Sequence, residues 1–179
     1  IANMMKRLAL IVAVACSFSV MAQQVTETKQ GLRVDPAGDK PTTEVTVYAP
    51  NIIRVTKYAD GLEALPAKKS YSVIMTPEKG KGLWSVEGNT LRTACITVTV
   101  DAATGEVRFA DADGNALLSE KGEAEVISIA SGVDKGKFSI RQDFKLGADE
   151  AIYGLGQRRS PKLNQRGEKV EIWNHNANI

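Results

Sequence analysis

The sequence predicts an all-β domain, built as an antiparallel β-sandwich of short strands. After residue 22, apolar side chains recur at every second position over many short segments, and no segment keeps a sustained 3.6-residue apolar period. Turn sequences such as Thr104-Gly105 and Asp113-Gly114 separate these segments at short intervals. The 179-residue chain is long enough for one domain with one hydrophobic core after that point.

The first clear strands flank Pro50-Asn51. Val45, Val47 and Ala49 share one face of a run that ends at this dipeptide, and residues 52–58 resume the pattern with many β-branched residues. We therefore expect two strands joined by a short turn.

A second group of strands follows between residues 94 and 118. Ala94, Ile96, Val98 and Val100 alternate with Cys95, Thr97 and Thr99. A turn over residues 101–105, a strand with Val107 and Phe109 on one face, and a turn at Asp113-Gly114 before residues 116–118 complete this group. Cys95 is the only cysteine after residue 22, so it has no internal disulfide partner, and we expect it to be a packed strand residue.

The last predicted strands lie near the end of the chain. Phe138, Ile140, Gln142 and Phe144 share one face of a run over residues 137–144, and residues 168–174 form the final predicted strand. Only five residues follow it, and the chain begins with Ile1 rather than Met. We therefore expect residues 23–179 to be a domain that is incomplete at its C-terminal end.

Residues 1–22 have the three-part pattern of a secretory signal peptide. Lys6 and Arg7 precede an apolar run over residues 8–21, and Ala22 provides a small residue before the cleavage site. The run is too short for a transmembrane segment, which needs about 20 apolar residues. The protein is therefore predicted to be exported, to the periplasm or the cell exterior; a lipoprotein anchored at Cys16 is the less favoured alternative.

The charge and the ligand inventory exclude several classes of function. The chain has 23 Lys and Arg against 21 Asp and Glu, and Lys6 and Arg7 are the only charged residues before position 23, so the exported part is neutral overall. Nucleic-acid binding needs a basic excess on one face, so no nucleic-acid partner is predicted. One histidine, His175, and one distant cysteine provide no metal-ligand spacing, so no metal and no cofactor are predicted.

Three short segments have both a functional and a structural interpretation, and the structural one is favoured for each. Residues 111–115 carry alternating oxygen ligands, as calcium loops do, but lack the rest of that motif, so a hairpin turn is expected. Gly154-Leu-Gly156 lacks the further residues of a phosphate loop, so a sharp turn, where the backbone approaches something closely, is expected. Residues 157–169 carry five basic residues against one acid, and a solvated loop whose arginines pair with acids elsewhere is favoured over a binding loop. The basic residues are Arg158, Arg159, Lys162, Arg166 and Lys169.

The candidate binding residues are Trp173, Asn176 and Asn178. Sugars are bound by aromatic faces together with planar amides, because hydroxyl groups need donors and acceptors side by side. The segment has both within six residues, although an Asn-rich turn explains the composition equally well. The sequence shows no carboxylate pair in a recognisable glycosidase context and no nucleophile elbow, so no catalytic residue is assigned.

Three motifs in order resemble glycoside hydrolase family 31, the α-glucosidases and α-xylosidases. They are Ile152-Tyr-Gly-Leu-Gly-Gln157, Leu163-Asn-Gln-Arg-Gly167 and Trp173-Asn-His-Asn176. The family's N-terminal β-sandwich resembles galactose mutarotase and ends in a similar run. Residues 45–57 look like its opening strands, so the resemblance spans residues 31–179.

The resemblance implies retaining hydrolysis of α-linked sugars by two Asp residues of a (β/α)8 barrel that follows this domain. That barrel lies outside this chain, so the chain alone is expected to be inactive. Asn176 and Asn178 match positions that reach the leaving-group subsite, and Asn176 stands where the family pattern has Asp. The Gln157 variant and the Leu163–Gly167 run favour the α-xylosidase side. The expected partners are an oligosaccharide substrate and the barrel. A stand-alone periplasmic carbohydrate-binding sandwich and a purely structural β domain are the alternatives.

Overall fold

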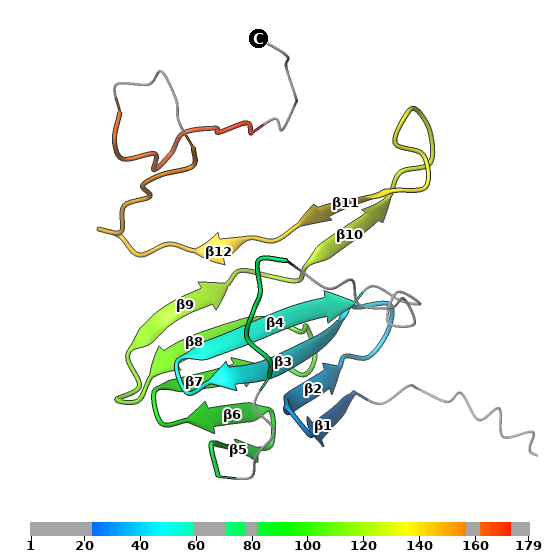
Figure 1. The fold of residues 1–179 in the computed structure, drawn as a ribbon. Coiled ribbons are helices and arrows are strands. Elements are labelled where there is room, and N and C mark those ends of the chain that lie inside the picture. The colour runs from blue at the N-terminus through cyan, green and yellow to red at the C-terminus, as the bar shows by residue number, and fades with distance from the viewer. Residues whose placement is uncertain (1–22, 59–70, 78–81, 157–161, 173–179) are drawn as a thin grey trace, which may run out of the picture.

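The structure is a computed structural model and describes residues 23–58, 71–77, 82–156 and 162–172. Their regular structure is entirely β, and every pair of neighbouring strands is antiparallel, which confirms the predicted all-β class (Figure 1). The described residues contain no helix with the length and apolarity of a membrane span.

A four-stranded sheet begins the fold, in the order β1-β2-β3-β4. It consists of β1 (Gln24–Thr28), β2 (Gly31–Asp35), β3 (Thr42–Ala49) and β4 (Ile52–Tyr58). The turn at Pro50-Asn51 falls where the sequence predicted it, and β4 has the predicted bounds. β3 is the most buried of the four strands, and β2 and β3 each have a neighbour on both edges and fully buried side chains against the second sheet.

The second sheet has six strands in the order β12-β9-β8-β7-β6-β5. They are β5 (Trp84–Glu87), β6 (Thr90–Thr93), β7 (Ile96–Val100), β8 (Val107–Asp111), β9 (Ala116–Glu120) and β12 (Phe144–Lys145). The loop between β7 and β8 is fixed by Asp101, whose carboxylate accepts hydrogen bonds from the backbone N–H groups of Ala103 and Thr104. These bonds, the first of them above all, lower the pKa of Asp101.

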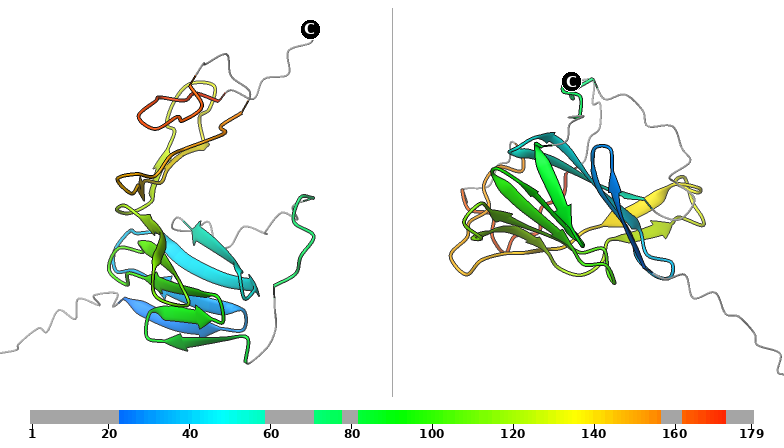
Figure 2. Two further views of the ribbon diagram at one scale, coloured as in Figure 1. Left: turned by 90° about the vertical axis from the view of Figure 1, so that its left-hand side faces the viewer. Right: turned by 90° about the horizontal axis from the view of Figure 1, so that it is seen from below.

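The core lies between the two sheets, as a sandwich requires (Figure 2). Fully buried side chains from β2 and β3 pack against fully buried side chains from β6, β7 and β8. They are Leu32, Val34, Val45, Val47, Leu91, Val98, Val100 and Val107. The period-two pattern predicted these inward faces for β3, β7 and β8. On β3 the opposite face is also largely buried, since Thr46 and Tyr48 are 7% and 8% exposed.

The prediction for Cys95 is wrong. Cys95 is exposed and lies with Ala94 in the tight turn between β6 and β7, rather than inside a strand. The hydroxyl of Thr93 accepts hydrogen bonds from the backbone N–H groups of Cys95 and Ile96 at 3.2 and 2.9 Å. These two hydrogen bonds close the turn, and β7 begins directly after it at Ile96.

The predicted single strand over residues 137–144 is divided in two. β11 (Phe138–Arg141) pairs with β10 (Glu125–Ser128), and this two-stranded hairpin, here called the arm, projects from the sandwich (Figures 1 and 2). β12 instead pairs with β9 at the edge of the six-stranded sheet. Gln142 and Asp143 separate β11 from β12, so the one apolar pattern over residues 137–144 belongs to strands of two different sheets.

The strand predicted over residues 168–174 is also corrected. Residues 168–172 have no strand pairing in the structure, and residues 173 and 174 lie outside the described ranges. An extended segment forms a strand only when its backbone groups exchange hydrogen bonds with a neighbouring strand. None of the described strands pairs with residues 168–172.

Candidate functional site

The candidate binding residues Trp173, Asn176 and Asn178 lie outside the described residues. The structure does describe the chain that leads to them, in two loops over residues 147–152 and 162–168, here called the frame. In Figures 1 and 2 the frame lies beyond β12, away from the core of the sandwich. Its contacts determine where the chain stands a few residues before Trp173.

Ile152 is the point at which the two loops of the frame are joined. Its backbone N–H donates to the side-chain oxygen of Asn164 at 3.1 Å, and its carbonyl accepts from the backbone N–H of Gln165 at 2.7 Å. The same Asn164 oxygen also accepts from the backbone N–H of Arg166 at 3.0 Å. Gln165 is buried, and its side-chain amide donates to the carbonyl of Lys162. Side-chain amides thus replace the backbone ladder that a strand pair would have provided.

Arg166 makes the second connection between the two loops. One guanidinium nitrogen donates to the carbonyls of Gly147 and Glu150, both at 2.6 Å. Lys162 forms an ion pair with Glu168 inside the frame. The expected pairing of arginines with acids elsewhere is not seen for Arg166, which binds backbone carbonyls, and Lys162 pairs with the one acid of the segment itself. Arg158 and Arg159 lie outside the described residues, and no contact of Lys169 bears on either interpretation.

Gly154, Leu155 and Gly156 form a sharp turn, as predicted. All three have positive φ, at 90°, 63° and 87°, and this conformation is costly for a residue with a Cβ such as Leu155. The expected close approach of this backbone to a neighbouring group is not seen: a Cβ at Gly154 or Gly156 would meet no described atom within 4 Å. The glycines are therefore explained here by backbone conformation alone.

Residues 111–115 form the hairpin turn between β8 and β9, as the structural interpretation predicted. The Asp111 carboxylate accepts from the side chain of Asn115 and from the backbone N–H groups of Asp113 and Asn115. These bonds, with the Asn115 side chain first, hold the pKa of Asp111 below its ordinary value. The oxygens of Asp111 close the turn, and no group of three potential metal ligands occurs among the described residues.

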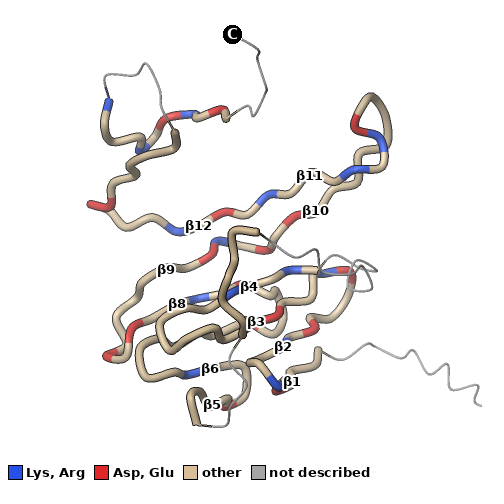
Figure 3. Tube along the Cα trace, in the orientation of Figure 1, with Lys and Arg blue, Asp and Glu red and all other residues tan. Residues whose placement is uncertain are grey.

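The charged groups of the described residues are of both signs, and the carboxyls with a shifted pKa share one direction of shift. The carboxyls with a clear departure all have a lowered pKa; in Asp35 and Asp143, a hydrogen bond from a neighbouring arginine is the main cause. Figure 3 shows both signs interspersed along the described chain, without a stripe of one sign.

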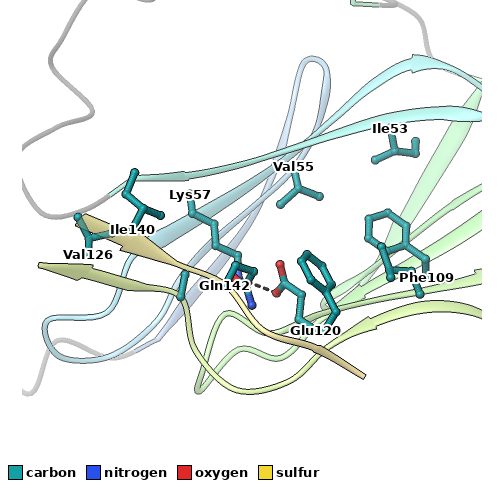
Figure 4. A pocket seen from close by; sticks show the side chains of 11 residues that line it. Ile53, Val55, Lys57, Phe109, Glu120, Val126, Ile140 and Gln142 are labelled. Atoms are coloured by element: carbon teal, nitrogen blue, oxygen red, sulfur yellow. Dashed lines mark hydrogen bonds and ion pairs between the residues drawn. The ribbon is translucent and has the colours of Figure 1, made fainter. Parts of the chain in front are cut away.

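A pocket of about 480 Å³ opens between the free end of the sandwich and the arm, here called the trough (Figure 4). β4, β8, β9, the arm and the residues leading into β12 all contribute to its wall. The lining residues are Ile53, Val55, Lys57, Phe109, Leu118, Glu120, Ala124, Val126, Ile140, Gln142 and Phe144.

A buried polar network lies at the base of the trough. The Lys57 ammonium donates to the Glu120 carboxylate at 2.6 Å, to the Gln142 side-chain oxygen at 3.2 Å and to the carbonyl of Gly105 at 3.1 Å. The side chains of Lys57 and Glu120 are only 13% and 7% exposed. Glu120 also accepts from the backbone N–H of Val107 at 2.7 Å. The network therefore joins both sheets to the segment that leaves the arm.

The sequence analysis did not identify this network, although two signals for it are present. Lys57 follows Ile53 and Val55 at the next inward position of β4, where an apolar residue is expected. Gln142 likewise occupies an apolar position between Ile140 and Phe144. A polar residue on an apolar face indicates a buried partner, because an unpaired one is costly.

Comparison with known proteins adds independent findings. Residues 42–178 match the family model described as the glycosyl hydrolase 31 N-terminal galactose mutarotase-like domain. The structure is also similar to a solved structure of the GH31 α-xylosidase from Xanthomonas citri, with a TM-score of 0.68 and 30% sequence identity. This match covers 85% of the present chain but only 17% of the α-xylosidase chain.

Proposed function

The chain belongs to the family of glycosyl hydrolase 31 N-terminal galactose mutarotase-like domains, and from this premise we propose that it is the first domain of an exported, retaining α-glycosidase. The proposed substrates are α-xylosides or α-glucosides. The similarity to an α-xylosidase at 30% identity supports the first of these. The match covers only 17% of the α-xylosidase chain, which favours an accessory role for this domain over a catalytic one.

The proposed role is to line the leaving-group subsite with Trp173, Asn176 and Asn178. The observation that carries this role is the frame: Asn164, Gln165 and Arg166 fix the chain just before the candidate residues. A loop held by side-chain hydrogen bonds to the backbone can present a short segment at a defined position without a strand pair.

The chemistry of these side chains suits binding rather than bond cleavage. A side-chain amide donates and accepts at once, which matches a sugar hydroxyl, and the tryptophan ring offers an apolar face to a sugar ring. An amide does not titrate, so Asn176 would keep its interactions at any working pH, unlike the Asp that the family pattern has there. The nucleophile and the acid–base carboxyl come from the rest of the enzyme, at the close spacing that retention requires.

The test is a comparison of two substrates with the enzyme encoded by the complete reading frame. Asn176→Ala and Asn178→Ala should each lower kcat/KM for an α-linked xylosyl disaccharide about tenfold, the effect of one hydrogen bond to a sugar hydroxyl. They should leave an aryl α-xyloside within about twofold, because an aryl leaving group has no hydroxyls to bind. The matched control is Asn51→Ala, in the turn between β3 and β4. Equal losses on both substrates would place the two residues outside the leaving-group subsite.

Two simpler experiments test whether the isolated domain is inactive and whether the protein is exported with cleavage after Ala22. Purified residues 23–179 should hydrolyse neither aryl α-xyloside nor aryl α-glucoside, and turnover by this piece would show that the catalytic carboxyls lie within it. The exported protein should begin at Gln23, which N-terminal sequencing of the secreted product reads directly. Retention of Lys6 and Arg7 in that product would contradict cleavage after Ala22.

A further inference from the structure

The sandwich is closed at one end and open at the other. At the closed end β2 contacts β5 and β6, and Leu32 and Leu91 are fully buried. At the open end lie β4 and β12, the edge strands of the two sheets, with the trough between them. The side chains there remain partly in water.

Apolar side chains converge on the trough without filling it. Leu118 is 42% exposed, Phe144 51% and Ile140 74%. Val126 and Ile140 are register partners, so they share the face of the arm that lines the trough (Figure 4). Such a gathering of exposed apolar groups from several elements marks an interaction site.

Two free strand edges border the trough. Among the described residues, β4 has a hydrogen-bonded neighbour on one side only, and the arm is a two-stranded sheet without a third strand. An isolated two-stranded hairpin is marginally stable in water, and a free edge is a template for another strand. The arm therefore needs a further contact to be stable where it stands.

The base of the trough limits the chemistry of its occupant. Lys57 and Glu120 neutralise each other, and Gln142 already accepts from Lys57, so the base offers no unsatisfied charge to a ligand. The walls are apolar and contributed by every second residue of β4, at positions 53 and 55. This arrangement fits an extended segment with uncharged, apolar side chains on one face.

We propose that the trough seats a β-strand from a part of the complete polypeptide that lies outside this chain, paired with the free edge of β4. The matched α-xylosidase has about five-sixths of its length outside the region of similarity, so a protein of this kind has ample chain to provide the strand. The inference shares with the proposed function only the requirement for a longer polypeptide. It does not depend on which sugar is hydrolysed or whether any is.

Thiol accessibility tests the proposal. Ile140→Cys places a thiol in the trough, and Ile127→Cys places one on the opposite face of the arm, where Ile127 is 57% exposed. Both are made with every other cysteine, including Cys95, replaced by serine. A maleimide should modify position 140 at least tenfold more slowly in the complete protein than in residues 23–179, and position 127 within about twofold in both.

Backbone hydrogen exchange provides a second measurement. Amides of β4 that do not pair with β3 should exchange at least tenfold more slowly in the complete protein than in residues 23–179. Equal modification and exchange rates in the two proteins would overturn the proposal, and so would equal protection of positions 127 and 140. If position 140 is already protected in isolated residues 23–179, and this protection rises with protein concentration, the occupant of the trough is a second copy of this chain. A reading frame that ends soon after codon 179 would also overturn it.

The outcomes distinguish this inference from the proposed function. If position 140 is protected in the complete protein but no α-glycoside is hydrolysed, the seated strand is supported and the proposed enzyme function is contradicted. If the enzyme is active but position 140 is unprotected, the function is supported and the seated strand is contradicted.

Discussion

Removing one partner of the Lys57–Glu120 pair should destabilise the domain far more than removing both. The two side chains are 13% and 7% exposed, and the Lys57 nitrogen lies 2.6 Å from the Glu120 oxygen. Glu120→Ala leaves a buried ammonium with only the neutral acceptors of Gly105 and Gln142. Breaking a buried ion pair in this way costs about 3–5 kcal/mol, and Lys57→Met should cost a similar amount by stranding the carboxylate.

The double variant Lys57→Met/Glu120→Met removes both charges together. The backbone N–H of Val107, which donates to Glu120 in the native domain, then remains unpaired, and the half-buried side-chain oxygen of Gln142 loses its bond from Lys57. The carbonyl of Gly105 keeps its hydrogen bond from Thr43. One such orphaned group costs about 1–3 kcal/mol, so the double variant should be more stable than either single variant. The costs of the single variants therefore do not add.

The assay is equilibrium urea unfolding of residues 23–179 and the three variants, followed by tryptophan fluorescence. Each single variant should also lower Tm by roughly 10 °C, since about 1 kcal/mol corresponds to a few degrees in a domain of this size. The matched control is Lys137→Ala, whose pair with Asp134 is mostly exposed and should contribute less than about 1 kcal/mol. A double variant as unstable as the sum of the two singles would refute the reasoning.

Three further predictions concern single residues. Gly31→Ala should cost about 3 kcal/mol or more in urea unfolding, because φ is 153° and a Cβ would stand 2.0 Å from the carbonyl oxygen of Val45. The hydrogen bond from Arg33 lowers the pKa of Asp35 in the folded domain, so this carboxylate stabilises the domain above its unfolded pKa of about 4. That contribution is lost as the pH falls through the folded pKa, and stability measured below pH 5 should therefore fall less steeply in Asp35→Asn than in the native domain. Because Cys95 is exposed, the folded domain should release one equivalent of thionitrobenzoate from dithionitrobenzoate without denaturant.

Each of these predictions has a control within the chain. Gly114→Ala also places a Cβ at positive φ, 89°, but meets no atom within 4 Å, so it should cost only about 1–2 kcal/mol. Asp113→Asn alters an exposed turn residue and should leave the acid dependence of Asp35 unchanged. The Cys95→Ser variant should release no thionitrobenzoate. A slow native reaction that denaturant accelerates would place Cys95 in the interior after all.

The predicted strands that match the structure have apolar side chains at every second position, on the face that packs against the core. Val45 and Val47 in β3, and Val98 and Val100 in β7, alternate with polar residues because their strands lie on opposite sides of one core. The alternation follows directly from that burial, so it can be recognised in the sequence without knowledge of the partner strands. Exposed edge strands such as β1 leave a weaker record, and the sequence analysis did not identify β1.

Alternation does not specify which strand lies next to which. Ile140 and Phe144 belong to one unbroken apolar pattern, yet β11 pairs with β10 and β12 pairs with β9. The change of partner occurs at Gln142, which is held by Lys57 from 85 residues earlier in the sequence. Cys95 was misplaced for a related reason: the hydroxyl of Thr93 closes a turn inside a run that reads as continuous strand. In both places a side-chain hydrogen bond, invisible to periodicity, decides the local structure.

The frame and the core of the sandwich differ in how they are stabilised, and this difference affects the candidate binding residues. Burial of Val45, Val98 and their neighbours holds the two sheets together. The frame is instead joined by hydrogen bonds that the Asn164 side-chain oxygen accepts and that the Arg166 guanidinium donates, and Leu163 within it is 78% exposed. Hydrogen bonds exposed to water add little net stability, so a segment with few buried apolar contacts opens more easily than the core. The residues proposed to contact substrate begin at Trp173, five positions after the frame ends. Binding of a sugar to Trp173 and Asn176 in the isolated chain is therefore expected to be weak.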